Sequence, residues 1–190
     1  MNRLNKIDLP TDQKEASALI KEYLFGSVSL FMSEDVTVVR PEFGASCSTY
    51  AVIDAMYKPD ISIFLDAYDT EWECLWKGES QEHFELFAPY IVKVTPDTQF
   101  SEWLLESGWG KEWGIYLRSY LPLSKLTHHL RKFNQIYNEI DERWVMFRYY
   151  APVTVKTFIP FMSASDFAEF TDGITQIISE DPEQRRLLVI

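Results

Sequence analysis

Cysteine and glycine are both scarce in this chain of 190 residues. Cys47 and Cys74 are its two cysteines, and two cysteines that form no CxxC pair do not provide a disulfide framework. We therefore expect two reduced, packed thiols. The 7 glycines are too few for a collagen-like or linker-like segment.

Long hydrophobic runs are missing as well. No apolar stretch approaches the roughly 18–20 residues that are needed to span a bilayer. Residues 1–10 also lack the apolar h-region of a signal peptide. We therefore expect a cytoplasmic protein without stable membrane insertion.

Positive charge is in deficit, because 18 lysines and arginines face 29 aspartates and glutamates, which gives a net charge of −11. Nucleic acids and anionic membrane surfaces are bound through lysine and arginine, so this excess of acid disfavours both as partners. It suits partners that carry basic or hydrophobic segments.

Apolar material is plentiful, at 46% hydrophobic and 15% aromatic residues, which is enough for a sizeable core. The length suits a single compact domain over residues 1–190, or one domain with two small lobes. Short apolar runs alternate with amphipathic segments, which predicts the α/β class with a mixed β-sheet flanked by helices. We predict helices over 11–25, 59–68, 80–87, 97–108, 123–133, 152–160 and 163–173, and strands over 50–54, 72–76, 90–94, 113–118, 135–139, 143–149, 174–178 and 187–190.

Charge is unevenly distributed along the chain. The segment Asp54–Glu85 holds nine acidic and two basic residues, whereas Arg118–Lys156 holds seven basic and three acidic residues. These segments indicate either two surfaces of opposite sign or regions that are solvated or pair with each other. Acidic residues at alternate positions near residues 69–73 are typical of an exposed strand edge that deters aggregation.

Motifs for catalysis, metals and cofactors are missing from the pattern. The histidines, His83, His128 and His129, form no HExxH or Cys/His cluster, and adjacent helical residues point about 100° apart. No GxSxG is present, and the Gly108–Gly110 stretch lacks the full GxGxxG. A Cys74–His129 pair stays open. We expect no metal, no cofactor and no catalytic set.

Three charged residues, Asp54, Arg118 and Arg148, lie at or near the C-terminal ends of predicted strands. That edge is the usual ligand side of an α/β sheet, which favours partner recognition. Buried charges also need a counter-charge, which favours a structural ion pair among the three. Trp103 and Trp144 fit core positions.

The ordered motifs of this chain resemble the bacterial domain-of-unknown-function family 4123. The resemblance covers about residues 48–175, and its most specific stretch is Gly108–Ser119. One departure is Ala151 before Pro152, where the family usually has an acidic helix cap. The other motifs are Tyr50–Ala55, Cys74–Gly78, Ala88–Val92, Leu126–Phe133, Met146–Tyr150, Val155–Pro160 and Phe167–Phe170.

This resemblance implies a non-enzymatic adaptor chaperone of a type VI secretion system. Such proteins bind a cognate effector, often near its N-terminal region, and help to join it to the VgrG spike. An exposed apolar patch would be the expected signature. The candidate partner-binding residues are Trp109, Trp113, Tyr116, Arg118, His129, Arg148, Tyr149 and Tyr150.

Two other functions remain open at the level of sequence. One is a small hydrolase or transferase that would use Asp54, Arg118, Arg148 and His129 in a deep polar pocket. The other is an acidic immunity protein that neutralises a basic toxin.

Overall fold

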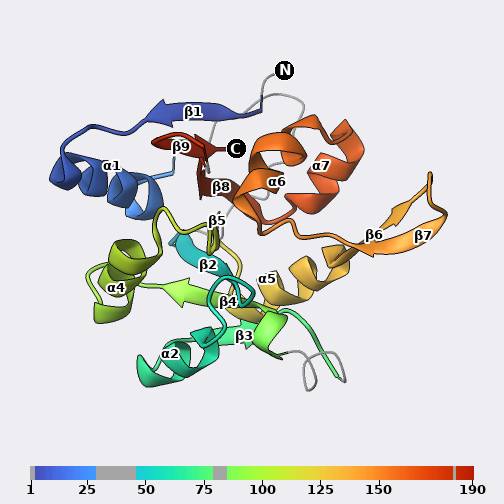
Figure 1. The fold of residues 1–190 in the computed structure, drawn as a ribbon, viewed down its shortest axis with the longest axis horizontal. Helices are drawn as coiled ribbons and strands as arrows, with labels where there is room; N and C mark the ends of the chain where they lie inside the picture. Colours follow the sequence, from blue (N-terminus) through green and yellow to red (C-terminus); the bar gives the residue numbers. More distant parts are fainter. Residues whose placement is uncertain (1–2, 29–45, 79–84, 182) are drawn as a thin grey trace.

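A seven-stranded β-sheet with helices on both faces forms the body of the molecule (Figure 1). The computed structural model describes residues 3–28, 46–78, 85–181 and 183–190. The strand order is β1-β9-β8-β5-β2-β4-β3. The strands are β1 Asn5–Asp8, β2 Ser48–Asp54, β3 Trp72–Cys74, β4 Pro89–Val94, β5 Gly114–Ser119, β8 Ile174–Glu180 and β9 Arg186–Val189. The helices are α1 Gln13–Phe25, α2 Ile61–Ala67, α4 Gln99–Gly108, α5 Leu123–Leu130, α6 Pro152–Thr157 and α7 Ala164–Phe170.

The predicted α/β class is confirmed, but the sheet differs from a mixed one. Every adjacent pair of strands in it is antiparallel. Helix α2 connects β2 to β3, which run in the same direction, but β4 lies between them in the sheet. In the same way α4 connects β4 to β5, and β2 lies between these two. Both helices therefore connect parallel strands, as in an α/β fold. Another strand lies between the two strands of each such pair, so all neighbouring strands are antiparallel.

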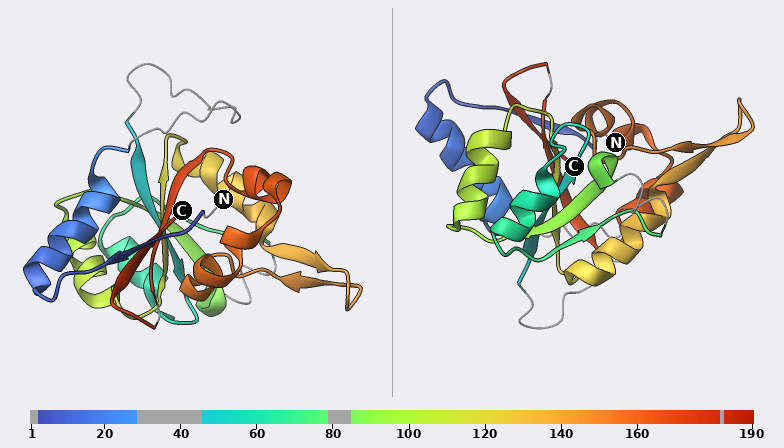
Figure 2. Two further views of the ribbon diagram at one scale, coloured as in Figure 1. Left: turned by 90° about the horizontal axis from the view of Figure 1, so that it is seen from above. Right: turned by 60° about the horizontal axis from the view of Figure 1, so that its bottom comes forward.

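The two faces of the sheet bury two separate apolar clusters. Strand β2 shows why, since Ala51 and Ile53 belong to one cluster and Tyr50 and Val52 to the other. This alternation places successive side chains on opposite faces, so a strand buried on both sides has a continuous apolar sequence. Helices α1, α2 and α4 cover the first face, and α5, α6 and α7 cover the second (Figure 2).

Most predicted elements lie close to their observed bounds, and the exceptions have local causes. Strand β1 was not predicted. Its four residues, NKID, are largely exposed and only Ile7 packs on the core beside β9, so the sequence shows no apolar run there. Residues 80–84 of the predicted helix over 80–87, which include His83, lie outside the described residues. The rest of that prediction, Glu85–Phe87, is a 3-10 turn. The segment Arg131–Phe133 continues α5 as another 3-10 turn.

The strands predicted over 135–139 and 143–149 form a two-stranded hairpin sheet of their own, with β6 Gln135–Asn138 and β7 Arg143–Met146. It extends away from the body of the molecule (Figures 1 and 2). We call Gln135–Met146 the β6–β7 arm. Its Trp144 is 66% exposed, so the core position predicted for this residue is wrong. No helix in the described part of the chain is both long and apolar enough to cross a membrane.

Candidate partner-binding surface

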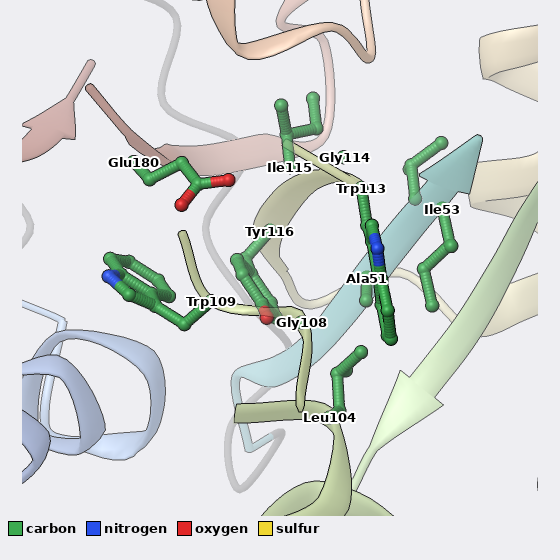
Figure 3. Close-up of a pocket in the computed structure, with 11 residues that line it drawn as sticks. Ala51, Ile53, Leu104, Gly108, Trp109, Trp113, Gly114, Ile115, Tyr116 and Glu180 are labelled. Carbon is green, nitrogen blue, oxygen red and sulfur yellow. The ribbon is translucent and has the colours of Figure 1, made fainter. Parts of the chain in front are cut away.

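Three of the predicted residues lie around one small pocket where α4 leads into β5. Trp109 stacks on Tyr116 with 5.9 Å between ring centroids, and Trp113 lines the other side of the pocket (Figure 3). Gly108 was expected to end its helix, which it does, and it also makes room for Trp113. A Cβ atom at Gly108 would approach the Trp113 ring to 2.7 Å.

Glu180, the last residue of β8, holds the turn beside this pocket and has no prediction from the sequence. Its carboxylate is buried and accepts hydrogen bonds from the backbone N–H groups of Gly110 and Glu112. Burial raises the pKa of the Glu180 carboxyl, and the two backbone donors partly oppose this rise. The sequence gives little signal for this role, because Glu180 begins an acidic run with Asp181 and Glu183. Glu180 therefore fixes the position of the turn that carries Trp109 and Trp113.

Asp54 and Arg148 form an ion pair where β2 ends. Arg148 Nε donates to Asp54 Oδ2 at 3.1 Å, and Arg148 Nη2 donates to the same oxygen. The other oxygen, Asp54 Oδ1, accepts the Met56 N–H at 2.9 Å. Desolvation is the largest single influence on the pKa of Arg148 and lowers it, but the hydrogen bond and the charge attraction to Asp54, with smaller contributions from Tyr150 and Tyr57, together outweigh it and the net shift is upward. The pair ties the central strand to the segment that follows the β6–β7 arm.

Arg118 lies at the opposite edge of the sheet from Asp54. Strands β2 and β5 are antiparallel, so their C-terminal ends point in opposite directions. The buried guanidinium of Arg118 donates to the carbonyl oxygens of Tyr23 and Gly26, both at 2.9 Å. A cation at the C-terminal end of α1 compensates the partial negative charge there. The prediction that Asp54, Arg118 and Arg148 lie together at one edge of the sheet is therefore wrong for Arg118.

The remaining predicted residues lie in the interior. His129 Nε2 donates to the Phe170 carbonyl at 2.9 Å, and its ring packs edge-on against Phe133. Tyr149 and Tyr150 are buried beside Phe170 and Arg148, and desolvation raises the pKa of both phenols. His129, Tyr149 and Tyr150 therefore belong to the core and are not part of an exposed binding surface.

The expectation of a packed thiol fits Cys74. It is buried, and burial raises the pKa of its thiol, which disfavours the nucleophilic thiolate. Its carbonyl accepts a hydrogen bond from Arg131 at 2.6 Å. Among the residues that the structure describes, no three His, Cys, Asp or Glu side chains gather as a metal site would require.

An exposed apolar surface lies on the β6–β7 arm, and further exposed apolar residues, Ile63, Leu86 and Phe87, lie on α2 and on the 3-10 turn before β4. Ile140 is 93% exposed at its tip, and Tyr137, Met146 and Trp144 are each half or more exposed. The Tyr137 and Trp144 rings meet edge to face across the two strands, 5.6 Å apart. The sequence QIYNEIDERWVM indicates this exposure, because apolar residues at consecutive positions in a short hairpin cannot all face one core. Neighbouring exposed apolar residues on α6 and its 3-10 continuation are Val153, Phe158 and Phe161.

The Arg148 guanidinium connects this surface to the end of β2. It lies 5.6 Å from the ring centroid of the exposed Tyr57, while its ion pair with Asp54 is buried. Met56, beside Tyr57, is also exposed. Arg148 is therefore the one residue of the predicted set that joins a buried ion pair to exposed apolar side chains at the base of the arm.

Comparison with known proteins gives one assignment. Searches of curated proteins and of solved structures found no match to the chain. The family model of the domain of unknown function DUF4123 matches residues 49–169. This range includes all of β2 except Ser48, the Trp109 turn, the Asp54–Arg148 pair and the whole β6–β7 arm. The chain therefore belongs to the DUF4123 family.

Proposed function

We propose that this protein is a cytoplasmic adaptor chaperone that binds a type VI secretion effector and helps to load it onto the VgrG spike. The observation that carries the proposal is the exposed apolar surface of the β6–β7 arm on a member of the DUF4123 family. Neighbouring exposed apolar side chains such as Tyr137, Trp144 and Met146 are typical of an interaction site, because soluble proteins rarely expose a contiguous apolar patch without a binding role. The net charge of −11 suits an effector segment that is basic or hydrophobic, in the N-terminal region of the effector.

The arrangement of the charged residues supports a binding role without catalysis. A hydrolase or transferase site would need Asp54, Arg118 and His129 within reach of one substrate. Instead, Asp54 pairs with Arg148, Arg118 binds the end of α1, and His129 bonds to the Phe170 carbonyl. Each of these groups is engaged in holding the fold.

Co-purification tests the proposal. The protein is expressed together with the secretion effector and the VgrG encoded beside its gene, and each is tagged in turn. We expect a stable complex with the effector, and loss of effector secretion when this protein is absent. Trp144→Ala should weaken the complex, and Ile63→Ala, which changes a similarly exposed apolar residue on α2 at the opposite face of the sheet, is the matched control.

Two results would contradict the proposal. One is an effector that stays soluble and is secreted normally without this protein. The other is protection of cells from a toxin by this protein alone, which would identify an immunity protein. A chaperone need not protect.

A further inference from the structure

The register of the β6–β7 arm determines which of its backbone groups face outward. Phe147 N–H donates to the Asn134 carbonyl at 2.9 Å, so these two residues form a hydrogen-bonded pair. Hydrogen-bonded and non-hydrogen-bonded pairs alternate in an antiparallel ladder. The pairs Gln135–Met146 and Tyr137–Trp144 are therefore the non-hydrogen-bonded ones. Their N–H and C=O groups point away from the partner strand, toward the two edges of the arm.

Both edges of the arm are free within the described part of the chain, because its sheet contains only β6 and β7. A free edge of unpaired backbone groups is a template for another strand. On the β7 edge the outward-facing residues are Trp144 and Met146, and both also expose apolar side chains. On the β6 edge the outward-facing residues are Gln135 and Tyr137, and only Tyr137 is apolar. The β7 edge therefore combines backbone hydrogen-bonding capacity with an apolar face.

The tip of the arm is acidic. Glu139, Asp141 and Glu142 are exposed there, and Arg143 offsets one of them, since its guanidinium lies 3.5 Å from the Asp141 carboxylate. Within the described residues, Glu139 and Glu142 have no ion-pair partner. A segment bound along β7 would thus meet apolar side chains near the base of the arm and negative charge near its tip.

We propose that the β7 edge of the arm binds an extended segment of the effector by β-strand addition. The segment adds as an antiparallel strand, which is the more stable pairing. Since β7 runs from the tip to the base, the C-terminal end of the bound segment lies at the tip. The segment therefore has apolar residues at alternate positions over Trp144 and Met146 and lysine or arginine at its C-terminal end. This inference rests on the proposed function only for the identity of the partner.

Binding to the 190-residue chain is measured by fluorescence anisotropy with a synthetic probe. The probe is a fluorescein-labelled nonapeptide of alternating valine and threonine with two lysines at its C-terminus. Two control peptides carry the lysines at the N-terminus or carry glutamates in their place. We expect the probe to bind at least about fivefold more tightly than either control, because the first control moves the lysines away from the acidic tip and the second places glutamates against it.

Proline substitution separates the contribution of the backbone N–H to binding from that of the side chain. Trp144→Ala and Trp144→Pro both remove the indole, but only proline removes the outward N–H, and the ladder within the arm keeps its hydrogen bonds. We expect Trp144→Pro to bind the probe about fivefold more weakly than Trp144→Ala. The matched pair on the β6 edge, Tyr137→Ala and Tyr137→Pro, should differ by less than twofold.

Hydrogen exchange of the unaltered protein gives a second measurement that needs no variant. The amides of Trp144 and Met146 should exchange rapidly alone and slow at least about tenfold when the probe is saturating, since they then donate to it. The Val145 amide, which faces β6, should change little. Equal binding by both Trp144 variants together with unchanged exchange at Trp144 and Met146 overturns the inference. So does a dimer in sedimentation that Trp144→Ala converts to monomer, because the occupant is then a second copy.

The two proposals can fail separately. If the effector co-purifies but Trp144→Pro and Trp144→Ala retain it equally, effector binding stands and strand addition at β7 is overturned. If the probe binds with the expected pattern but no effector depends on this protein, the strand-binding edge stands and the secretion role falls.

Discussion

At the scale of single residues, loss of the Asp54–Arg148 pair should measurably lower the stability of the fold. Asp54 is buried, so Arg148→Ala leaves its carboxylate without a counter-charge. Breaking a buried pair costs about 3–5 kcal/mol, and because Arg148 is one third exposed we expect about 2 kcal/mol in the free energy of unfolding. Urea denaturation measures this loss.

The control for this substitution is Arg143→Ala. Its partner Asp141 is exposed on the arm, so we expect a change within about 0.5 kcal/mol. Adding Asp54→Asn to Arg148→Ala should recover part of the stability, because it removes the unpaired charge. Equal effects of Arg148→Ala and Arg143→Ala would show that the Asp54 pair contributes no more than a surface pair.

Glu180 predicts a pH dependence of stability. Its pKa in the folded protein is raised above the ordinary value of 4.5, so the folded state binds a proton more readily than the unfolded chain. The stability that Glu180 contributes is therefore fully present below pH 4.5 and is lost as pH rises through the higher folded pKa. Glu180→Gln cannot ionise and lacks this dependence.

The free energy of unfolding of both proteins, measured from pH 4 to pH 8, isolates this contribution, because all other groups titrate alike. We expect the parent protein to lose stability relative to Glu180→Gln as pH rises. A constant difference across this range would mean that the carboxylate ionises normally in the folded protein.

At the scale of elements, close approach between strands determines one position strictly. Gly114 begins β5 opposite Ile53, and a Cβ atom there would lie 1.8 Å from the Val52 carbonyl oxygen. Gly114→Ala must push β5 away from β2 in the centre of the sheet. We expect a loss of about 3 kcal/mol or more in the free energy of unfolding, measured by urea denaturation.

Gly78→Ala provides the comparison, because a Cβ atom at Gly78 meets open space and the cost there is backbone strain alone, at a φ of +64°. We expect about 1 kcal/mol for it. If Gly114→Ala cost no more than Gly78→Ala, strand β5 would have to tolerate a shift that the register of the sheet argues against.

The elements could largely be predicted from the sequence, whereas their pairing could not. Apolar runs such as Tyr50–Asp54 and stripes such as Leu126–Leu130 depend on local periodicity, which the sequence displays directly. The insertion of β4 between β2 and β3 depends on contacts between distant segments. Of the candidate site residues, Trp109, Trp113 and Tyr116 do lie together. Trp144 was misplaced because an apolar residue in a predicted strand was assumed to face a core.

At the scale of the whole molecule, the two segments of opposite charge pair with each other. Asp54 binds Arg148, and Glu73 lies 3.4 Å from Arg131, so both contacts join the acidic segment to the basic one. Lys156 pairs with Asp181 and Glu183. Much of the basic segment is thereby neutralised, and the net charge of −11 is the charge that a partner meets at long range.

This excess of acid predicts that binding depends on salt and on where the negative charge lies. The probe with C-terminal lysines should bind the unaltered protein more weakly at 300 mM than at 50 mM NaCl, since exposed charges are screened. Neutralising the arm tip with Glu139→Gln and Glu142→Gln should lower affinity about three- to tenfold at low salt and flatten the salt dependence. Fluorescence anisotropy at both salt concentrations measures this.

A second double variant separates local from long-range charge. Glu22→Gln and Glu106→Gln remove the same two charges from exposed positions on α1 and α4, which cover the opposite face of the sheet from α5, α6 and α7. If the acidic tip recognises the end of the bound segment, the tip variant loses affinity and the distant variant keeps nearly all of it. Equal losses in both would mean that the net charge of the protein attracts the segment, and that the arm tip does not distinguish one end of it from the other.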